Sequence, residues 1–354
     1  MEPGYGLDVV GLGALNIDLL AIRTSPEDHP VEDRETLTTR REIEARCHAE
    51  PLATEPFLGG SAFNAIAMLA QLRADLRLGM VGISAAPDHG LTESHADRLR
   101  SLHVVDLTRH SELRPGVCLG LSSPHGRQLR TAPEANLEIV DYLRDNDRLR
   151  TLVASARILH LTSLLERPGD PGADDVSQAV ASFVETVKHD NPQLILSLDP
   201  GHTWVGTLDR LPALRRIYAH ADVVYANAQE YAVLTVGGDT HSSVRAWSMR
   251  GLCPAGPLVI VKSLHEIVVQ HAGGFDVARV PRRDSNSAVD PTGAGDAVAA
   301  GVLAALGQGR SVMEGCELGL RIAAHRVADY GDRGHAELRS SLGTLWPPDV
   351  PTPV

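Results

Sequence analysis

The segment Asp290-Pro291-Thr292-Gly293-Ala294-Gly295-Asp296 has the residue types and the spacing to bind an anion and to move a proton. A helical pattern of small apolar residues follows it directly, so the segment is predicted to form the turn that begins a helix. Small residues let the backbone approach a ligand closely, and amides at a helix N-terminus point at an anion bound there. Asp296 would repel a phosphate group, but it could accept the proton of an attacking hydroxyl group. The alternative is structural: residues 293–296 only start a helix, with Asp296 as its N-cap or beside its dipole.

A second segment, Phe57-Leu58-Gly59-Gly60-Ser61-Ala62-Phe63-Asn64, places two glycines before a helical pattern, with Asn64 about one turn inside the helix. Such a turn frees backbone groups, and the Asn64 amide can both donate and accept hydrogen bonds. Sugar hydroxyl groups require that mixture. The alternative is an ordinary junction between a loop and a helix, with Phe63 and Ile66 anchored in the core.

These two segments, in this order, resemble the two sequence signatures of the ribokinase (PfkB-type) carbohydrate kinase family. Three further matches extend the resemblance over nearly the whole chain: Gly11-Leu12-Gly13-Ala14-Leu15-Asn16-Ile17-Asp18, Ser197-Leu198-Asp199-Pro200 and Asn227-Ala228-Gln229-Glu230. The resemblance implies a ribokinase-like three-layer α/β sandwich with a mainly parallel central sheet and a small β-rich lid. It also implies a kinase that moves the γ-phosphate of ATP to a hydroxyl group of a sugar, a sugar derivative or a nucleoside.

The resemblance assigns roles to the residues of the acceptor and phosphoryl sites. Asp296 matches the catalytic base, and Gly293, Ala294 and Gly295 match the anion hole for the transferred group. Contacts to substrate hydroxyl groups are implied for Asn16, Asp18, Gly59, Gly60 and Asn64.

The resemblance also implies a nucleotide site with Mg²⁺. Asn227 and Glu230 match an N-x-x-E motif that organises Mg²⁺ and phosphate, with Glu230 acting on the metal through water; without the resemblance, the pair would be interpreted as a solvated helix cap. Lys262 and Thr292 are assigned to the nucleotide and phosphate site. Asp290 and Thr292 also match positions that bind a monovalent cation such as K⁺ in some members.

One loop departs from the family pattern. After the strand that ends near Lys262, family members usually carry glycines that let the backbone approach the nucleotide, whereas Leu264 and Ile267 replace them here. The bulkier side chains are predicted to reshape the adenine or phosphate site.

A dehydrogenase and a non-catalytic binding protein are the alternatives to a kinase. Gly11-Leu12-Gly13-Ala14-Leu15-Asn16 begins like a dinucleotide fingerprint, but Asn16 replaces its third glycine, which argues against a dehydrogenase. A non-catalytic relative that binds a sugar or nucleoside is favoured by the altered loop at Leu264 and opposed by the retention of Asp296 with its glycines. A metabolite-dependent thermal shift without ATP turnover would distinguish such a protein from a kinase.

The elements that must position these residues alternate between strand and helix, which predicts a mainly parallel sheet covered by helices. Strands are predicted at residues 8–13, 156–161, 194–198, 221–226 and 258–261, with a hairpin over 267–280. Helices are predicted at residues 62–72, 176–188, 208–218, 297–306 and 312–329.

Two stretches break this alternation, at about 23–56 and about 104–133. Together they are predicted to form the lid, which would exclude water from a reactive phosphoryl group. A long surface insertion is the alternative for the first stretch. One kinase domain over residues 1–345, an irregular tail over 346–354 and a homodimer through the lid are further expectations.

Composition restricts the partners. The net charge of -12 argues against a broad nucleic-acid or anionic-membrane surface, because such ligands need clustered Lys and Arg. The four cysteines form no C-x-x-C pair, and the sequence shows neither a leader nor a membrane span, so a cytoplasmic protein is expected. Because aromatic residues make up only 4% of the chain, a sugar is favoured slightly over a nucleoside as the small-molecule partner.

Overall fold

The computed structural model describes most of the chain. The described residues are 6–22, 34–49, 54–73, 75–123, 126–170, 173–208, 212–234, 256–263, 266–271, 274–279 and 292–328, with Leu338 and Ser340. Asp290, Leu264 and the predicted tail 346–354 lie outside them.

A large sheet forms the centre of the described part, with strand order β14-β13-β12-β11-β10-β9-β1-β5-β6. Its strands are β1 (Val9–Leu12), β5 (Leu78–Ala85), β6 (Val105–Ser111), β9 (Ile158–Thr162), β10 (Ile195–Asp199), β11 (Val223–Asn227), β12 (Leu258–Lys262), β13 (Glu266–His271) and β14 (Gly274–Arg279). Neighbouring strands run parallel, except that β13 is antiparallel to both β12 and β14. The mainly parallel sheet and the hairpin predicted after residue 267 are confirmed.

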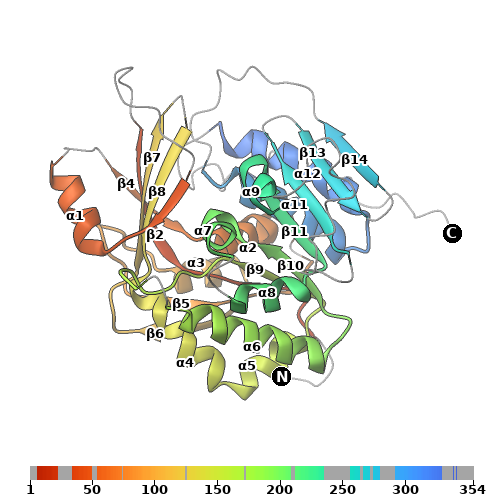
Figure 1. The fold of residues 1–354 in the computed structure, drawn as a ribbon, viewed down its shortest axis with the longest axis horizontal. Helices are drawn as coiled ribbons and strands as arrows, with labels where there is room; N and C mark the ends of the chain where they lie inside the picture. The colour runs from red at the N-terminus through yellow and green to blue at the C-terminus, as the bar shows by residue number, and fades with distance from the viewer. Residues whose placement is uncertain are drawn as a thin grey trace.

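Helices cover both faces of this sheet, because its inner strands are apolar on both sides; every residue of β1, β5 and β9 is buried. One face packs against α4 (Ile139–Arg144), α5 (Asp147–Ala154), α6 (Asp175–Asp190), α7 (Gly201–Thr207), α8 (Pro212–Ala219) and α9 (Ala228–Leu234), after a 3-10 turn at Glu134–Glu138. The other packs against α2 (Ser61–Leu72), α3 (His95–Ser101), α11 (Ala294–Gly307) and α12 (Val312–Arg326). The predicted three-layer α/β sandwich is therefore confirmed (Figure 1).

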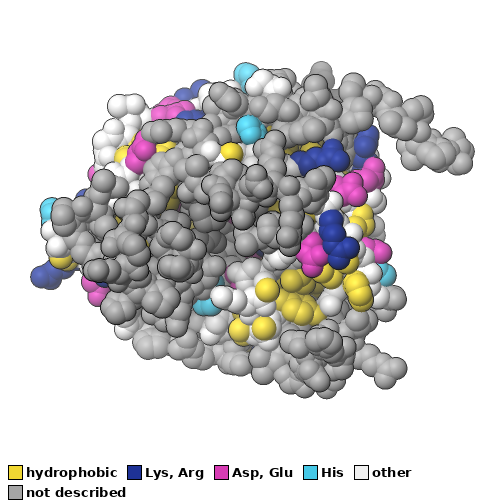
Figure 2. All heavy atoms as spheres, turned by 90° about the horizontal axis from the view of Figure 1, so that it is seen from above, with side chains coloured by type: hydrophobic (Ala, Val, Ile, Leu, Met, Phe, Trp, Pro, Cys, Tyr) yellow, Lys and Arg dark blue, Asp and Glu magenta, His cyan; other side chains and the backbone are white. Residues whose placement is uncertain are grey.

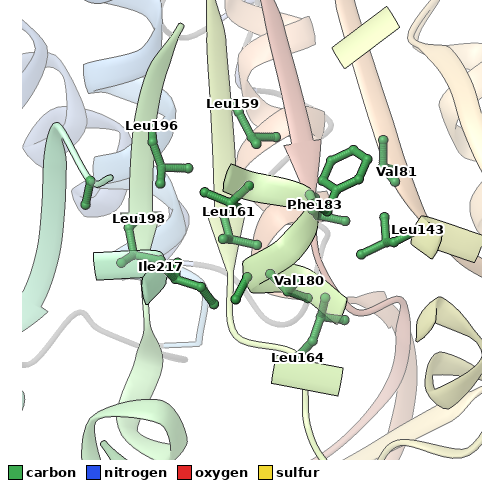
Figure 3. Close-up of a cluster of buried hydrophobic side chains, with 14 of the residues drawn as sticks. Val81, Leu143, Leu159, Leu161, Leu164, Val180, Phe183, Leu196, Leu198 and Ile217 are labelled. Atoms are coloured by element: carbon green, nitrogen blue, oxygen red, sulfur yellow. The ribbon is translucent and has the colours of Figure 1, made fainter. Parts of the chain in front are cut away.

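Figure 3 shows how the first face is filled. Leu159 and Leu161 of β9 and Leu196 and Leu198 of β10 point at side chains of α6 and α8, including Phe183. All of these side chains are buried. This close packing makes the sheet a rigid support for the loops at its ends.

A second, smaller sheet stands beside the large one, with strand order β3-β8-β7-β2-β4 (Figure 1). Its strands are β2 (Asn16–Ile22), β3 (Arg34–Leu37), β4 (Glu55–Gly59), β7 (Gly116–Ser123) and β8 (Gly126–Ala132). The helix α1 (Arg40–Ala49) packs on one face of it through Ile43. Asn16, Gly59 and Gly116 lie side by side at one end of this sheet, where it adjoins the large sheet.

The small sheet takes strands from both ranges predicted for the lid, but the boundaries differ. β2 belongs to it although it begins before residue 23, because the chain passes from β1 into the small sheet within three residues. β6 lies in the large sheet although it falls within 104–133. It pairs with β5 along its whole length, with Val105 opposite Gly79 at one end and Ser111 opposite Ala85 at the other.

The surface in Figure 2 mixes both signs of charge. Among the side chains described on that face, Lys and Arg groups lie beside Asp and Glu groups and do not gather into one basic patch. In the described part of the chain, no helix combines the length and the apolar character needed to cross a membrane.

Candidate active site

Chemistry-bearing side chains gather where the parallel strands of the large sheet end. Asp199, Asn227 and Lys262 are the last residues of β10, β11 and β12, three neighbouring strands. In open α/β sheets, ligands bind at this carboxyl edge. The N-terminus of α11 reaches the same place, because a methyl group built on Gly295 would lie 3.1 Å from the Lys262 Nζ.

The start of α11 has the geometry predicted for the anion-binding turn. Gly293 is the N-cap residue and adopts a left-handed conformation with φ of 80°, which a glycine adopts at little cost. Gly293 has no side chain that could accept hydrogen bonds from the first amides of the helix, and a helix N-terminus of this kind favours an anion. Asp296 lies in the first turn and is not the N-cap, so the cap interpretation of Asp296 is wrong, whereas its position beside the helix dipole fits the other part of the structural alternative.

Asp296 contacts the second segment singled out in the sequence. The Asn64 side-chain amide, in the first turn of α2, donates a hydrogen bond of 2.9 Å from Nδ2 to Asp296 Oδ2. The two residues are 232 positions apart in the chain. A hydrogen bond to a carboxylate fixes its orientation, so Asn64 holds the Asp296 carboxylate in place at the start of α11.

Lys262 is mostly buried, with 15% of its side chain exposed, and its Nζ lies 2.7 Å from Asp199 Oδ2. Burial opposes the charge on the amine, but the carboxylates of Asp199 and Glu230 outweigh it and raise the pKa of Lys262. Asp296 adds to this effect. A permanent ammonium group therefore stands beside the first turn of α11.

Asn227 and Glu230 form a reciprocal cap at the start of α9. The Asn227 amide donates to Glu230 Oε2 at 2.8 Å, and the Glu230 amide donates to Asn227 Oδ1 at 2.8 Å. The geometry thus confirms the capping interpretation of this pair, but the pair is not solvated, because Glu230 is only 5% exposed. Burial raises the pKa of Glu230, and the nearby Lys262 counteracts part of that effect.

The remaining predicted residues meet at the joint between the two sheets. Asn16 is paired with Gly59 on one side and with Gly116 on the other. A methyl group on Gly59 would overlap the Asp18 carboxylate, and one on Gly60, where φ is 115°, would overlap the Ala14 carbonyl oxygen. Only glycine therefore lets these groups lie so close together.

Three residues that contact the predicted site residues received no role from the sequence. Asn136 donates from Nδ2 to Asn16 Oδ1 at 2.9 Å, and its own Oδ1 accepts from the Leu15 amide. His95 Nε2 lies 3.0 Å from the Gly59 carbonyl oxygen, and burial lowers the pKa of His95 to about 4, so this ring is neutral. The third is Asp199, the partner of Lys262.

Only one of the three carried a usable signal in the sequence. Asp199 follows a predicted buried strand and precedes Pro200, and a carboxylate at the carboxyl end of a parallel strand is a candidate ligand. Asn136 and His95 belong to no motif, and only the fold brings them to Asn16 and Gly59.

Two predicted features of the nucleotide side change with the structure. Thr292 is described and directly precedes Gly293, but Asp290, its expected partner around a cation, lies outside the described residues. Ile267 lies in β13, pairs with Lys262 of β12 and is fully buried in the core. Its side chain therefore packs inside the protein and does not line a nucleotide loop.

The close packing of Gly59 against Asp18 leads to a test. We expect Gly59→Ala to displace the Asp18 carboxylate and to raise the KM for the acceptor by at least about tenfold, because a hydrogen bond from the acceptor to a charged group is lost. The KM for ATP should stay unchanged. Steady-state kinetics on the variant checks this, with Gly206→Ala as the control, since a methyl group there meets nothing within 4 Å. An unchanged acceptor KM in a folded Gly59→Ala protein would contradict the placement of Asp18 in the acceptor site.

A comparison with family models decides the classification. Residues 35–337 match the model described as pfkB family carbohydrate kinase. The chain belongs to that family. The family resemblance of the two glycine-containing segments is thereby confirmed, and so is the expectation of an ATP-dependent carbohydrate or nucleoside kinase. Asn16 and Asp18 precede the matched range, so their assignment to the acceptor site stays a prediction.

One curated relative of this pfkB family member is a cytidine kinase from Thermococcus kodakarensis, 29% identical over 128 residues. The match covers 35% of this chain and 44% of that relative, which is less than half the length of either protein.

Solved structures agree on the fold. The adenosine kinase from Sinorhizobium meliloti has a TM-score of 0.77 at 20% identity, with 97% of this chain and 100% of that chain covered. Ribokinase from Giardia lamblia has a TM-score of 0.71 at 15% identity over the same shares. The adenosine kinase from Schistosoma mansoni, in complex with 2-fluoroadenosine, has a TM-score of 0.75 at 15% identity, covering 91% and 96%. At these identities the likeness shows that the pfkB family member has the ribokinase-like fold.

Proposed function

We propose that this protein phosphorylates a hydroxymethyl group of a sugar or sugar derivative with ATP, and that Asp296 is the general base. The observation that carries the proposal is the hydrogen bond from Asn64 to Asp296 at the N-terminus of α11. It fixes a carboxylate in the same turn as the first amides of α11. A base and an anion-binding site at that spacing fit the transfer of a phosphoryl group to a hydroxyl oxygen.

The acceptor is held at the joint between the sheets. The Asp18 carboxylate accepts hydrogen bonds from hydroxyl groups of the acceptor. The side-chain nitrogen of Asn16 donates to them, since Asn136 already donates to the side-chain oxygen of Asn16. Gly59 and Gly60 lie directly against Asp18 and Ala14 because neither residue has a side chain, and their backbone groups are proposed to contact the same hydroxyl groups. The acceptor is thereby fixed with one hydroxyl group directed at Asp296, and this orientation contributes to the rate.

The proton and the phosphoryl group then move in opposite directions. The oxygen of the acceptor hydroxyl group attacks the γ-phosphorus while Asp296 takes the proton of that hydroxyl group. The bond between the γ-phosphorus and the bridging oxygen of the β-phosphate breaks, and ADP leaves. The amides of Ala294 and Gly295 and the ammonium group of Lys262 offset the negative charge on the transferred group. Because Lys262 is fixed by Asp199 beforehand, this charge requires little reorganisation during the reaction.

Glu230 is the residue proposed to hold Mg²⁺. Its buried carboxylate faces the carboxyl edge of the sheet, and Mg²⁺ is usually bound through one or two carboxylates together with phosphates and waters. A single carboxylate that acts through water, as the resemblance implies for Glu230, is compatible with this way of binding. When bound, Mg²⁺ would supply positive charge to the phosphate oxygens of ATP.

The small sheet acts as the lid in this proposal. Thr203 of α7 donates a hydrogen bond of 3.1 Å to Glu35 of β3, and Thr131 of β8 donates to the other Glu35 oxygen at 2.7 Å. These bonds connect the small sheet to a helix that follows β10 at the carboxyl edge. A lid held in this way would keep water from the phosphoryl group.

A nucleoside is the second candidate acceptor. It carries a hydroxymethyl group on a ribose ring, so Asp18 and Asn16 could bind its hydroxyl groups in the same manner. The cytidine kinase match and the adenosine kinase folds favour this candidate.

The experiment that tests the proposed function is a panel of acceptors. ADP formation is measured with Mg²⁺ and ATP across sugars, sugar acids, sugar phosphates and nucleosides, and each stimulating acceptor is checked by mass spectrometry for one added phosphate group. One class that stimulates ADP formation and gains the phosphate supports the proposal. Thermal stabilisation by an acceptor with no phosphorylated product from any of them would instead support a non-catalytic binding protein.

A further inference from the structure

Arg326 brings a second buried cation to the first turn of α11. It is the last residue of α12 and is only 3% exposed. A methyl group built on Gly293 would lie 3.4 Å from Nε of Arg326 and 3.7 Å from its Nη2. The guanidinium group is therefore in van der Waals range of the residue that caps α11.

The packing of α11 on α12 fixes this arrangement. A methyl group on Gly315 would lie 2.7 Å from the Val302 Cα, and one on Gly319 would lie 2.7 Å from the Val298 Cα. Backbones that approach so closely cannot slide past each other without clashing. The guanidinium group of Arg326 and the N-cap of α11 therefore belong to one rigid unit.

The charge of Arg326 suits the task of this turn. Asp296 places a negative charge where the γ-phosphate must arrive, and the helix N-terminus contributes only about half a positive charge. A guanidinium group carries a full positive charge. Lys262 on one side and Arg326 on the other thus make the turn attractive to a phosphate group despite Asp296.

The same position bears on the monovalent cation expected at Asp290 and Thr292. Thr292 is the residue directly before Gly293, so a K⁺ ion bound there would share the turn with the guanidinium group of Arg326. Two positive charges in one buried turn repel each other, and the second is held less tightly. The guanidinium group of Arg326 beside Gly293 therefore opposes the binding of a monovalent cation next to Thr292.

We propose that Arg326 is a positioning residue for phosphoryl transfer, which supports the Gly293 turn and supplies its fixed positive charge, so that this kinase works without an added monovalent cation. The proposal rests on the proposed function, because it concerns the same phosphate-binding turn.

Two sets of measurements test it. The wild-type kcat is measured in K⁺, Na⁺ and choline salts at constant ionic strength, and we expect the values to agree within about twofold, since screening is then equal. Arg326→Gln should lower kcat by about 10- to 100-fold, and guanidinium or K⁺ ions added to this variant should restore part of the rate. Arg326→Lys, which keeps the charge, should lose less.

Controls separate the role of Arg326 from effects on stability and from failure of the proposed function. Arg321→Gln removes the same charge from an exposed position of α12 and should leave kcat unchanged. If no acceptor is phosphorylated by the wild type, the Kd of MgATP measured by calorimetry decides: weaker binding by Arg326→Gln than by Arg321→Gln supports the role of Arg326.

Three results would overturn the inference. They are a wild-type kcat that K⁺ raises tenfold or more over choline, an unchanged kcat in folded Arg326→Gln, and, where there is no turnover, equal MgATP affinity of the two glutamine variants. If Arg326→Gln does not fold, the cation series and Arg326→Lys still decide.

Discussion

Replacing Asp296 by Asn should lower kcat by about 10²- to 10⁴-fold, which is the usual contribution of a general base. The amide has nearly the same shape and can still accept the hydrogen bond that Asn64 donates at 2.9 Å, so the turn should keep its geometry. It cannot take the proton of the acceptor hydroxyl group. The affinities for acceptor and ATP should therefore change little, and steady-state kinetics with calorimetric binding measurements separates the two effects.

The control for Asp296→Asn is a carboxylate at another helix start. Asp175 lies in the first turn of α6, is exposed and belongs to no part of the proposed site. Asp175→Asn should leave kcat unchanged. If both variants keep the wild-type kcat, Asp296 contributes only to its helix, and the assignment of the base is wrong.

Replacing Lys262 by Met should lower kcat by about 10²- to 10³-fold, because a fixed positive charge beside the transferred group is lost. The variant should also be less stable by ~3 kcal/mol, since the mostly buried carboxylate of Asp199 loses its partner at 2.7 Å. Urea unfolding and steady-state kinetics measure the two effects separately.

A double variant distinguishes catalysis from stability. Combining Lys262→Met with Asp199→Asn removes both charges, so most of the stability should return while kcat stays low. Lys188→Met provides a control away from the site, because Lys188 forms an ion pair with the more exposed Asp222 at 3.0 Å, at the opposite edge of the sheet. Recovery of kcat in the double variant would contradict a catalytic role for Lys262.

Much of the fold could be predicted from the sequence, because apolar runs and helical periods are local properties of the chain. The helices predicted at 62–72, 176–188, 297–306 and 312–329 correspond to α2, α6, α11 and α12. The turn at Gly293 was also predictable, since its small residues and the following helical pattern are consecutive in the chain.

What the sequence could not predict is which distant side chains touch. Asn64 and Asp296 were both singled out, but their order and spacing contain nothing that shows a hydrogen bond between them. The same holds for Arg326, which lies in an ordinary helical pattern and reaches Gly293 only because glycines bring α11 and α12 together. The range predicted for the lid includes β6 because strand pairing depends on residues far apart in the chain. The comparison with family loops places Ile267 in a loop because it does not show that Ile267 pairs with Lys262 between two strands.

The measurement that tests the central claim most directly is single-turnover transfer of the γ-phosphate. ATP labelled in that position is mixed with excess enzyme, Mg²⁺ and the acceptor found in the panel, with wild type and Asp296→Asn side by side. We expect the label to move to the acceptor on the wild type and to move at least about 100-fold more slowly on the variant. Equal transfer rates, or label released as inorganic phosphate with none on the acceptor, would contradict the account.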